Sequence, residues 1–431
     1  MMKTTMPNTL EGWLAFQLAG SRAEIVLGLE RVRTVAAALR LGRPARLIVS
    51  VAGTNGKGST VAFVEAIARA GGHRVGAYTS PHLLRYNERI RIDGIDASDE
   101  ELCAAFARIE SAREQAGVSL TYFEYGTLAV LLLFADAAID LAILEVGMGG
   151  RLDAVNLVDG DVAIVTSIDL DHQEWLGQDR ETIAREKAGI FRAGAIAVLA
   201  ERDPPHALPE RARDIGASTR NAGVDYDWSV DSGDWRWRSN TGRELRLPLP
   251  QLAGVVQFSN ASAAIAALDA LALRLPLEEA AFAQGVRQAS VPGRLQRVQW
   301  RDRNLLLDVA HNPQAAGALD ELLEAAYGDR TVMAVFGGLA DKDTAGILAP
   351  LKHRVRHWFC GGLEAQSPRG LPGDTLADRV RLAGASASGH QTVEQAFKAA
   401  CAAAASDELI VCFGSFFVVA AMMQALDTSS T

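Results

Sequence analysis

The spacing of apolar and polar positions divides the chain into two successive patterns of alternating strands and helices. Short apolar runs alternate with segments whose apolar residues recur at helical spacing, first from about residue 46 to residue 191 and again from about residue 297 onward. Strands that alternate with helices favour parallel sheets. We therefore expect an α/β protein of two domains, covering residues 1–296 and 297–431.

The individual elements follow from the same periodicity. In the first domain the expected strands are 46–51, 75–79, 141–146 and 162–167, and the expected helices are 10–41, 61–70, 98–116, 121–138, 180–191 and 259–273. In the second domain the expected strands are 305–308, 331–336, 355–359 and 409–412, and the expected helices are 313–327, 343–351 and 392–404. The second, smaller domain is thus predicted to be Rossmann-like, with a mostly parallel sheet.

Local cap and turn signals add detail to this outline. Ser98 and Glu101 predict a capping box. Gly28, inside the helical pattern of residues 10–41, indicates a break or a close approach by another group. Segments 87–96 and 226–247 each contain a turn sequence and are typical of β-hairpins.

One glycine-rich run stands between the first expected strand of the sheet and the helix that follows it. It reads Val51-Ala52-Gly53-Thr54-Asn55-Gly56-Lys57-Gly58-Ser59-Thr60. The glycines allow positive φ and bring backbone N–H groups close to an anion, and the helix adds the positive end of its dipole. Lys57 supplies a charge for phosphate, and Ser59 or Thr60 supplies a hydroxyl for Mg²⁺.

The run is shorter than the usual phosphate-binding loop, G-x-x-x-x-G-K-[ST]. Val51 stands at the first glycine position, and Gly58 follows the lysine. An ordinary strand-to-helix turn with one exposed lysine is the alternative interpretation. Three glycines, a lysine and two hydroxyls at such a junction favour a P-loop mononucleotide-binding domain.

Composition and charge exclude several classes of partner. The chain has 431 residues, 49% of them apolar and 22% charged, as in a globular protein with a large core. A net charge of −9 disfavours binding to nucleic acid. The four cysteines are scattered, as in a reducing cytoplasm. The most apolar window, 128–146, is interrupted by acidic residues, so we expect a cytoplasmic protein without a membrane partner.

Six motifs, in order along nearly the whole chain, resemble those of the folylpolyglutamate synthases of the Mur ligase superfamily. They are Gly53-Thr54-Asn55-Gly56-Lys57-Gly58-Ser59, Thr79-Ser80-Pro81-His82, Glu145-Val146-Gly147-Met148-Gly149-Gly150-Arg151-Leu152-Asp153, Asp171-His172, Glu186-Lys187-Ala188-Gly189 and Asp308-Val309-Ala310-His311-Asn312-Pro313. The resemblance implies an ATP-dependent, amide-forming ligase. It also implies ATP, two Mg²⁺ ions and a monovalent cation as cofactors.

The resemblance implies a metal site that also serves catalysis. Its members are Ser59, Ser80, Glu145, His172 and a carbamylated Lys187, with Lys57, His172 and Lys187 as the catalytic residues. Oxygen ligands at neighbouring strand ends suit Mg²⁺. Taken alone, His172 is equally typical of a hydrogen-bonded loop residue, and Lys187 of a surface lysine paired with Glu186 or Asp171.

The same resemblance implies nucleotide and substrate contacts. In addition to the glycine-rich run, the residues implied to contact the nucleotide are Asn260, Arg294 and Asp308. His311 and Ser415 match positions near the interdomain cleft. The subset of the family that handles both dihydropteroate and folates is similar to this chain at Leu27-Gly28-Leu29-Glu30-Arg31 and Thr121-Tyr122-Phe123-Glu124, and Leu152, Asp153 and Ala154 complete the predicted pterin site. As alternatives, Asn260 is a helix N-cap, Arg294 a solvated charge, and Tyr122 and Phe123 core residues.

The predicted reaction is phosphorylation of a substrate carboxylate by ATP, followed by attack of the amine of L-glutamate. The products are dihydrofolate or folylpolyglutamates, ADP and phosphate, and the family resemblance implies a monomer. Three alternatives remain at this point: a folylpolyglutamate synthase without the dihydropteroate activity, a ligase for cell-wall nucleotide precursors, and a nucleotide switch that binds a partner and is no ligase. Gly58 and the run 121–124 speak against the cell-wall ligase.

Overall fold

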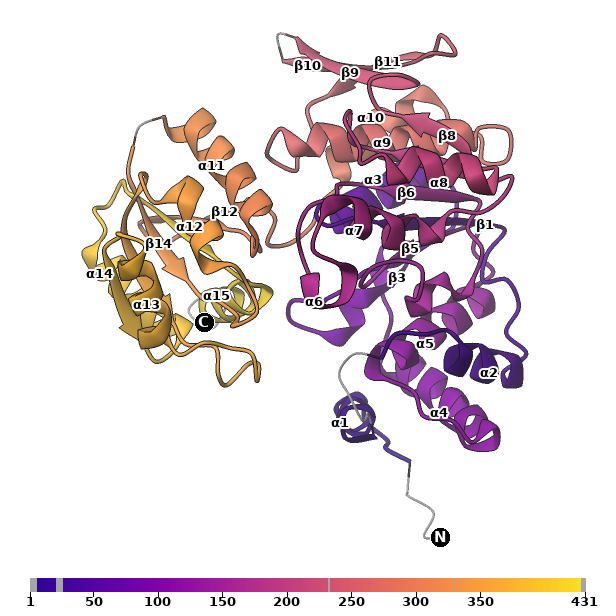
Figure 1. Ribbon diagram of the computed structural model, residues 1–431, viewed down its shortest axis with the longest axis horizontal. Helices are drawn as coiled ribbons and strands as arrows, with labels where there is room; N and C mark the ends of the chain where they lie inside the picture. The colour runs from indigo at the N-terminus through magenta and orange to yellow at the C-terminus, as the bar shows by residue number, and fades with distance from the viewer. Residues whose placement is uncertain (1–5, 21–25, 232, 329, 428–431) are drawn as a thin grey trace. The chain divides into compact units, whose positions relative to one another are not determined.

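A computed structural model describes residues 6–20, 26–231, 233–328 and 330–427, which form two compact units. Unit 1 comprises Met1–Gln251 and Phe258–Ser290, and unit 2 comprises Leu252–Gln257 and Val291–Thr431. The main segment of unit 2 thus starts six residues before the boundary predicted at 297. The predicted α/β class is confirmed, because each unit is built on a parallel-rich sheet flanked by helices (Figure 1).

The sheet of unit 1 has eight strands in the order β4-β3-β2-β5-β1-β6-β7-β8. Six of them, from β2 to β8 in this order, are parallel, and the β3–β4 hairpin is antiparallel. Their bounds are β1 Leu47–Ala52, β2 Val75–Tyr78, β3 Ile90–Ile92, β4 Ile95–Asp96, β5 Leu141–Glu145, β6 Val162–Val165, β7 Ile196–Leu199 and β8 Ser218–Asn221. The expected hairpin at 87–96 is confirmed, with Asp93 and Gly94 at positive φ in its turn.

Helices cover both faces of this sheet. Alternate strand residues such as Ile48, Ala142 and Val165 pack into one core with α4 and α5, whereas α3 and α10 pack against each other on the opposite face. The helices are α3 Lys57–Ala70, α4 Asp99–Ala116, α5 Tyr122–Ala137, α6 Gln173–Leu176, α7 Arg180–Lys187, α8 Ala207–Ile215, α9 Val256–Ala270 and α10 Glu279–Gln288, with 3-10 turns η1 Tyr86–Arg89, η2 Ala154–Leu157 and η3 Ala188–Ile190. No helix in the described part of the chain has the length and apolar character needed to cross a membrane.

The prediction of one helix over residues 10–41 is wrong. The structure has two, α1 Leu10–Gly20 and α2 Glu30–Ala38, and residues 21–25 lie outside the described residues. The break expected at Gly28 is present: this residue has φ +134° and its N–H donates to Leu152 O at 3.3 Å. A helical φ at this position is incompatible with that contact.

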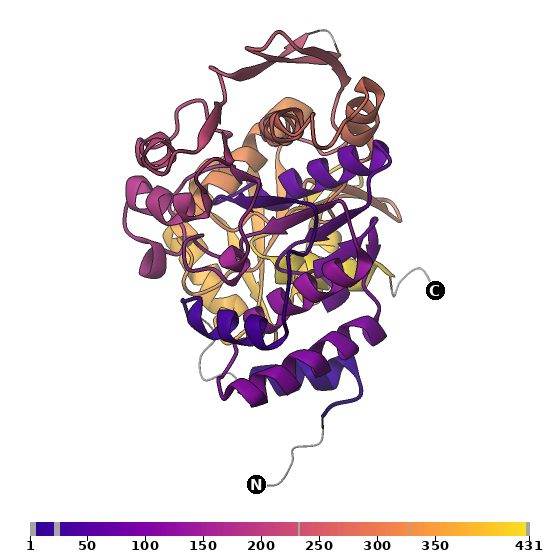
Figure 2. The same ribbon diagram turned by 90° about the vertical axis from the view of Figure 1, so that its right-hand side faces the viewer.

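The segment expected to be a β-hairpin forms a three-stranded antiparallel sheet in the order β11-β10-β9. The strands are β9 Tyr226–Asp231, β10 Asp234–Ser239 and β11 Glu244–Pro248. Alternation is strict, since Trp235, Trp237, Leu245 and Leu247 are buried while the arginines between them are exposed. Within unit 1 this sheet lies at the opposite end from α4 in both views (Figures 1 and 2).

Unit 2 has a six-stranded sheet in the order β12-β13-β17-β14-β15-β16, in which only β12 is antiparallel. The strands are β12 Gln296–Trp300, β13 Arg303–Leu307, β14 Val332–Phe336, β15 Val355–Gly361, β16 Ala387–His390 and β17 Leu409–Phe413. The helices are α11 Pro313–Tyr327, α12 Thr344–Leu351, α13 Gly373–Leu382, α14 Val393–Ala403 and α15 Phe416–Asp427. The sequence pattern did not predict β12, α13, β16 or α15.

Candidate active site

The glycine-rich run forms the predicted strand–loop–helix junction, from the end of β1 to the start of α3. Gly53 has φ +152° and Gly56, the N-cap of α3, has φ +85°. A Cβ atom on Gly53 would lie 1.8 Å from Thr166 Oγ1, and one on Gly56 would lie 2.5 Å from Asn260 Oδ1. Only glycine fits at these two positions.

Two residues that the sequence motifs did not single out hold the loop in place. The backbone N–H groups of Thr54 and Asn55 donate to Ser167 O (2.6 Å) and Ser167 Oγ (3.1 Å), and Thr166 Oγ1 donates to Asn55 O (2.6 Å). Thr166 and Ser167 follow β6, which pairs directly with β1. Their position after a strand was the available signal, because ligand sites gather beyond the carboxyl ends of parallel strands.

Two lysines converge on one oxygen of the loop. Lys57 Nζ donates to Gly53 O (3.0 Å) and Thr54 O (3.1 Å), and Lys187 Nζ, from the last turn of α7, donates to Gly53 O (2.9 Å). Lys187 is buried, which contradicts the interpretation of a surface lysine. Burial and, to a smaller extent, the charge of Lys57 lower the pKa of Lys187 to about 7, while Asp171 and Asp153 oppose the shift.

The predicted metal ligands come from the ends of several elements. Glu145, at the end of β5, accepts a hydrogen bond from Ser80 N–H at 3.1 Å, and a Cβ on Gly58 would lie 3.9 Å from its Oε2. Ser59 is buried in the first turn of α3, so Ser80, Glu145 and the start of α3 are neighbours. Their hydroxyl and carboxylate oxygens are ligands of the kind that Mg²⁺ prefers.

His172 is the outlying member of the metal set. It lies at φ +49° just before α6, and its Nε2 is 3.8 Å from Asp171 Oδ2. Asp171 in turn contributes to the electrostatic environment of Lys187. Within the described residues no three His, Cys, Asp or Glu side chains are grouped as metal ligands. A metal here would therefore depend on hydroxyl groups as well as on Glu145.

The three segments predicted to bind a pterin lie together. Gly28 bonds to Leu152, and Arg31 pairs with Glu124 at 2.8 Å. A Cβ on Gly147 would lie 2.6 Å from Phe123 and 3.2 Å from Asp153 Oδ2. The segments 27–31, 121–124 and 152–154 therefore meet at one place, next to the motif that follows β5.

Some members of this group also have local structural roles. Thr121 and Glu124 form a capping box at the start of α5, with bonds of 3.2 and 2.7 Å. Asp153 accepts N–H bonds from Met148 and Val155, both at 2.9 Å. Burial raises the pKa of Asp153 to about 6, although these backbone donors oppose the shift.

A histidine–arginine pair beside Tyr122 was also missed. Arg89 Nε donates to His82 Nδ1 at 2.8 Å, and the Arg89 guanidinium lies over the rings of Tyr86 and Tyr122. Because arginine only donates, His82 must carry its ring hydrogen on Nε2. Burial and the charge of Arg89 lower the pKa of His82 to about 4. The motif Thr79-Ser80-Pro81-His82 was the signal, but its histidine was assigned no role.

Asn260 is placed beside the loop by α9. This helix starts at Val256, so the predicted start near residue 259 is wrong and Asn260 is not its N-cap. Its side chain faces Gly56 instead, as the distance of 2.5 Å from Oδ1 to a Cβ there implies. The structure thus brings Asn260 to the nucleotide loop, within unit 1.

The remaining predicted residues form a cluster within unit 2. Asp308 accepts N–H bonds from Leu295 (2.8 Å) and Ala310 (2.7 Å), and burial raises its pKa while the charge of Arg294 opposes the shift. The ring of Phe416 lies under the Arg294 guanidinium and 6.1 Å from that of His311. Ser415 Oγ accepts the N–H of Val418 at the start of α15. Arg294, Asp308, His311 and Ser415 therefore share one environment.

Comparison with known proteins places these motifs in a family context. The Mur ligase middle domain matches residues 51–268, and the glutamate ligase domain of Mur ligases matches residues 293–416. The dihydrofolate synthase/folylpolyglutamate synthase of Escherichia coli K12 is 45% identical over 97% of this chain and 96% of its own, and that of Haemophilus influenzae is 36% identical over 97% of both.

Solved structures are similar over the full length. E. coli FolC in complex with DHPP and ADP superposes with a TM-score of 0.93 at 43% identity, covering 100% of both chains. A bifunctional folylpolyglutamate synthase/dihydrofolate synthase with Mn, AMPPNP and L-glutamate bound superposes with a TM-score of 0.89 at 45% identity, covering 99% of this chain and 100% of the other.

Proposed function

The chain belongs to the Mur ligase family and, within it, to the dihydrofolate synthase/folylpolyglutamate synthases, and from that premise we propose how its residues divide the work of an ATP-dependent acid–amino-acid ligase. The enzyme joins L-glutamate to dihydropteroate and to folates with ATP and a divalent metal. The ligase assignment excludes the nucleotide switch, and the relatives at 45% and 36% identity speak against the cell-wall ligase.

The observation that carries the proposal is the pair of lysines on Gly53 O. We assign Gly53, Thr54, Asn55, Gly56, Lys57, Gly58, Ser59 and Thr60 to the ATP phosphates, with Lys57 moving its charge from loop carbonyls to the transferred phosphoryl group. The hydroxyl of Thr60 is buried and has no hydrogen-bond partner within the described residues, so a donor is left over in the first turn of α3. That turn is where phosphate and its metal would be held.

Magnesium would be held by Ser59, Ser80 and Glu145, with His172 and carbamylated Lys187 completing the set. The metal would supply electron withdrawal from the phosphate oxygens. For carbamylation, the neutral Nζ of Lys187 attacks CO₂, a C–N bond forms, and one proton leaves to solvent, giving an anionic carbamate. The lowered pKa of Lys187 supports this step, because only the neutral amine is nucleophilic. We retain a monovalent cation as part of the proposed cofactor set.

The pterin is assigned to the group formed by segments 27–31, 121–124 and 152–154. Phe123 offers a flat apolar face, and Asp153 offers a carboxylate for the N–H groups of a pterin edge. The carboxylate on the benzoate part of dihydropteroate would then be phosphorylated, and the amine of glutamate would displace phosphate. Exclusion of water protects the acyl phosphate from hydrolysis.

The remaining assignments concern nucleotide and glutamate. We propose that Asn260 from unit 1 and Arg294 and Asp308 from unit 2 contact the nucleotide, and that His311 and Ser415 contact glutamate. Residues 1–296 would thus be the ATP- and pterin-binding domain, and residues 297–431 the glutamate-binding domain. We further propose that the enzyme works as a monomer in the cytoplasm.

The test uses dihydropteroate labelled with ¹⁸O in its carboxylate, together with ATP, Mg²⁺ and L-glutamate. Dihydrofolate and phosphate should form in equal amounts, and each phosphate should carry one ¹⁸O atom, because the acyl phosphate transfers that oxygen. Glu145→Gln should lower kcat by about a hundredfold or more, whereas Glu244→Gln, an exposed carboxylate on β11, should not. The mechanism is contradicted if the rate of ATP hydrolysis does not depend on glutamate, or if the phosphate released carries no ¹⁸O.

A further inference from the structure

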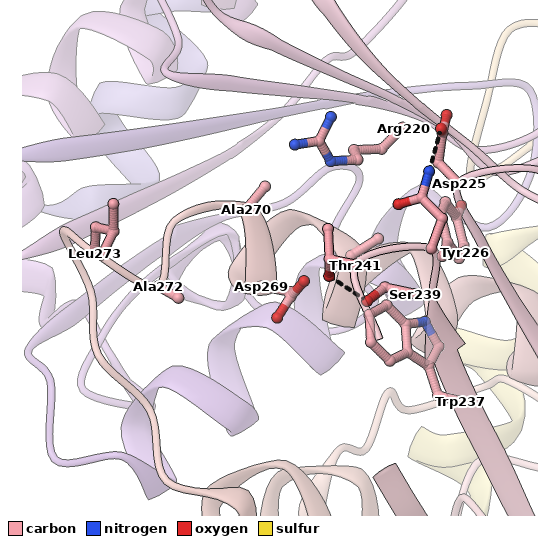
Figure 3. A pocket seen from close by; sticks show the side chains of 12 residues that line it. Arg220, Asp225, Tyr226, Trp237, Ser239, Thr241, Asp269, Ala270, Ala272 and Leu273 are labelled. Carbon is pink, nitrogen blue, oxygen red and sulfur yellow. Dashed lines mark hydrogen bonds between the residues drawn. The ribbon is translucent and has the colours of Figure 1, made fainter. Parts of the chain in front are cut away.

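A cavity with a volume of about 290 Å³ lies in unit 1 between β8, the three-stranded sheet and the C-terminal end of α9 (Figure 3). Its walls include Arg220 from β8, Trp237 from β10 and Asp269 from α9. Asp269 is nine residues beyond Asn260, which corresponds to about 13 Å along the helix axis. The cavity is therefore distinct from the nucleotide loop, and none of its walls has a part in the proposed reaction.

The two acidic side chains of the cavity are already engaged by the protein. Asp225 accepts hydrogen bonds from the backbone N–H (2.7 Å) and the side chain (2.9 Å) of Asn221, and a third from the Asn240 side chain (3.0 Å). Asp269 forms an ion pair with Arg243 at 2.7 Å. The carboxylate of Asp269 is thus neutralised by a cation, whereas the oxygens of Asp225 are taken up by neutral amide donors.

Arg220 is the exception among the charged groups. Its Nη1 donates to Thr219 O at 2.9 Å, and the guanidinium makes no ion pair with any residue that the structure describes. A guanidinium has five N–H donors in a planar fork, so most of its donors remain for a ligand. Figure 3 shows this group extending toward the hollow from the side opposite Asp269. Arg220 is therefore the charged wall residue that still has donors available for a ligand.

The rest of the wall is largely apolar and sets the size of the ligand. Ala266, Ala270 and the fully exposed Leu273 provide methyl groups, and the hydroxyls of Ser239 and Thr241, which bond to each other at 2.7 Å, lie on the other wall. A volume near 290 Å³ is at the lower end of small-molecule sites. The carboxylate of Asp225, which accepts its hydrogen bonds from neutral amide groups, disfavours a second negative charge on the ligand.

We infer that this cavity is a second ligand site, which binds a small organic monocarboxylate through Arg220 and holds its apolar body against α9. A bidentate pair between guanidinium and carboxylate provides the orientation, and the methyl groups of Ala266 and Ala270 provide the apolar contact. The inference does not depend on the residue assignments of the ligase reaction, because no residue is shared between the two sites.

The test measures binding directly by ¹⁹F NMR of the full-length enzyme labelled with 5-fluorotryptophan. The chain has seven tryptophans, and a Trp237→Phe variant identifies the resonance of the cavity residue. Benzoate and butyrate are the probes, and benzamide is the uncharged control of the same shape as benzoate. Both carboxylates should shift the Trp237 resonance in a saturable way, also when an ATP analogue and dihydropteroate are bound. Benzamide should bind at least about tenfold more weakly than benzoate.

Matched variants then test the contact. Arg220→Gln should weaken benzoate binding about tenfold or more, and Arg220→Lys should weaken it less because the charge is kept. Arg236→Gln is the control: this exposed arginine on β10 belongs to the same sheet but does not line the cavity. All three variants should keep wild-type ligase activity and melting temperature. Equal affinity in Arg220→Gln, or no shift of Trp237 with either carboxylate, overturns the inference.

Discussion

Lys57 and Lys187 donate to the same oxygen, Gly53 O, over distances of 3.0 and 2.9 Å. Two ammonium groups at one carbonyl repel each other, and Lys187 is the buried one, so it is the group whose charged form is destabilised. The phosphate loop and the end of α7 are therefore coupled in two ways: by the hydrogen bond from Lys187 to Gly53 O, and by the repulsion from Lys57 that contributes to the Lys187 pKa of about 7.

This relationship predicts that Lys187 is selectively carbamylated. At pH 8 an amine of pKa about 7 is roughly nine-tenths neutral, whereas an ordinary lysine of pKa 10.5 is well below about one per cent neutral. With ¹³CO₂ at fixed partial pressure, a ¹³C carbamate resonance should appear and kcat should rise in parallel as the pH passes upward through about 7. Lys187→Arg should lose both; a resonance that survives in this variant would assign the carbamate to another amine.

The same shift predicts that Lys187 lowers stability near neutral pH. The unfolded state binds its proton up to pH about 10.5 and the folded state only up to about 7, so stability rises with pH between these values. In CO₂-depleted buffer, Lys187→Met should therefore melt at least about 3 °C above the wild type at pH 7, and the gain should shrink toward pH 10. Scanning calorimetry measures both, and Lys352→Met, at an exposed lysine, should show neither effect.

Two glycines with nearly the same φ allow the cost of backbone strain to be distinguished from the effect of a steric contact with Asn260. Gly56 has φ +85° and would place a Cβ 2.5 Å from Asn260, whereas Gly72, just beyond α3, has φ +82° and no atom within 4 Å of such a Cβ. Alanine at either site should cost about 1–2 kcal/mol of stability from the left-handed conformation. Only Gly56→Ala should also raise KM for ATP, by about tenfold or more. Equal ATP kinetics in the two variants would remove Gly56 from the nucleotide site.

The elements that were predicted correctly are those whose signals, such as a capping box or a turn, lie in residues close together in the sequence. The Ser98–Glu101 capping box and the Asp93–Gly94 turn depend on residues close together in the chain, and both are present in the structure. Helix α15 was missed because its apolar residues occur on all sides, so that no 3.6-residue period stands out at Phe416–Asp427.

The parts of the site that were missed depend on strand order. Thr166 and Ser167 reach the loop because β6 lies beside β1, more than a hundred residues away in sequence, and nothing local encodes that adjacency. Asn260 was placed at a helix start because Asn is a common N-cap, whereas α9 begins at Val256, so that Asn260 lies within the helix and its side chain faces Gly56. At Asn260, therefore, tertiary contacts overrode a local preference, whereas at Thr166 and Ser167 no local preference existed.

The pKa of Asp153 predicts how pterin binding responds to pH. This carboxyl has a pKa of about 6 because it is buried, so it ionises as the pH rises through that value, and only the carboxylate can accept hydrogen bonds from both a backbone N–H and a pterin N–H at each oxygen. In addition to the rise through about pH 7 expected from Lys187, we expect kcat/KM for dihydropteroate to show a separate rise through pH 6, while KM for ATP stays constant. Asp153→Asn should lower kcat/KM about tenfold to a hundredfold and flatten this limb of the profile. Asp179→Asn changes an exposed N-cap of α7 that likewise accepts a backbone N–H, so it should reduce stability without moving the profile. A rise through pH 6 that persists in Asp153→Asn would mean that another group controls pterin binding.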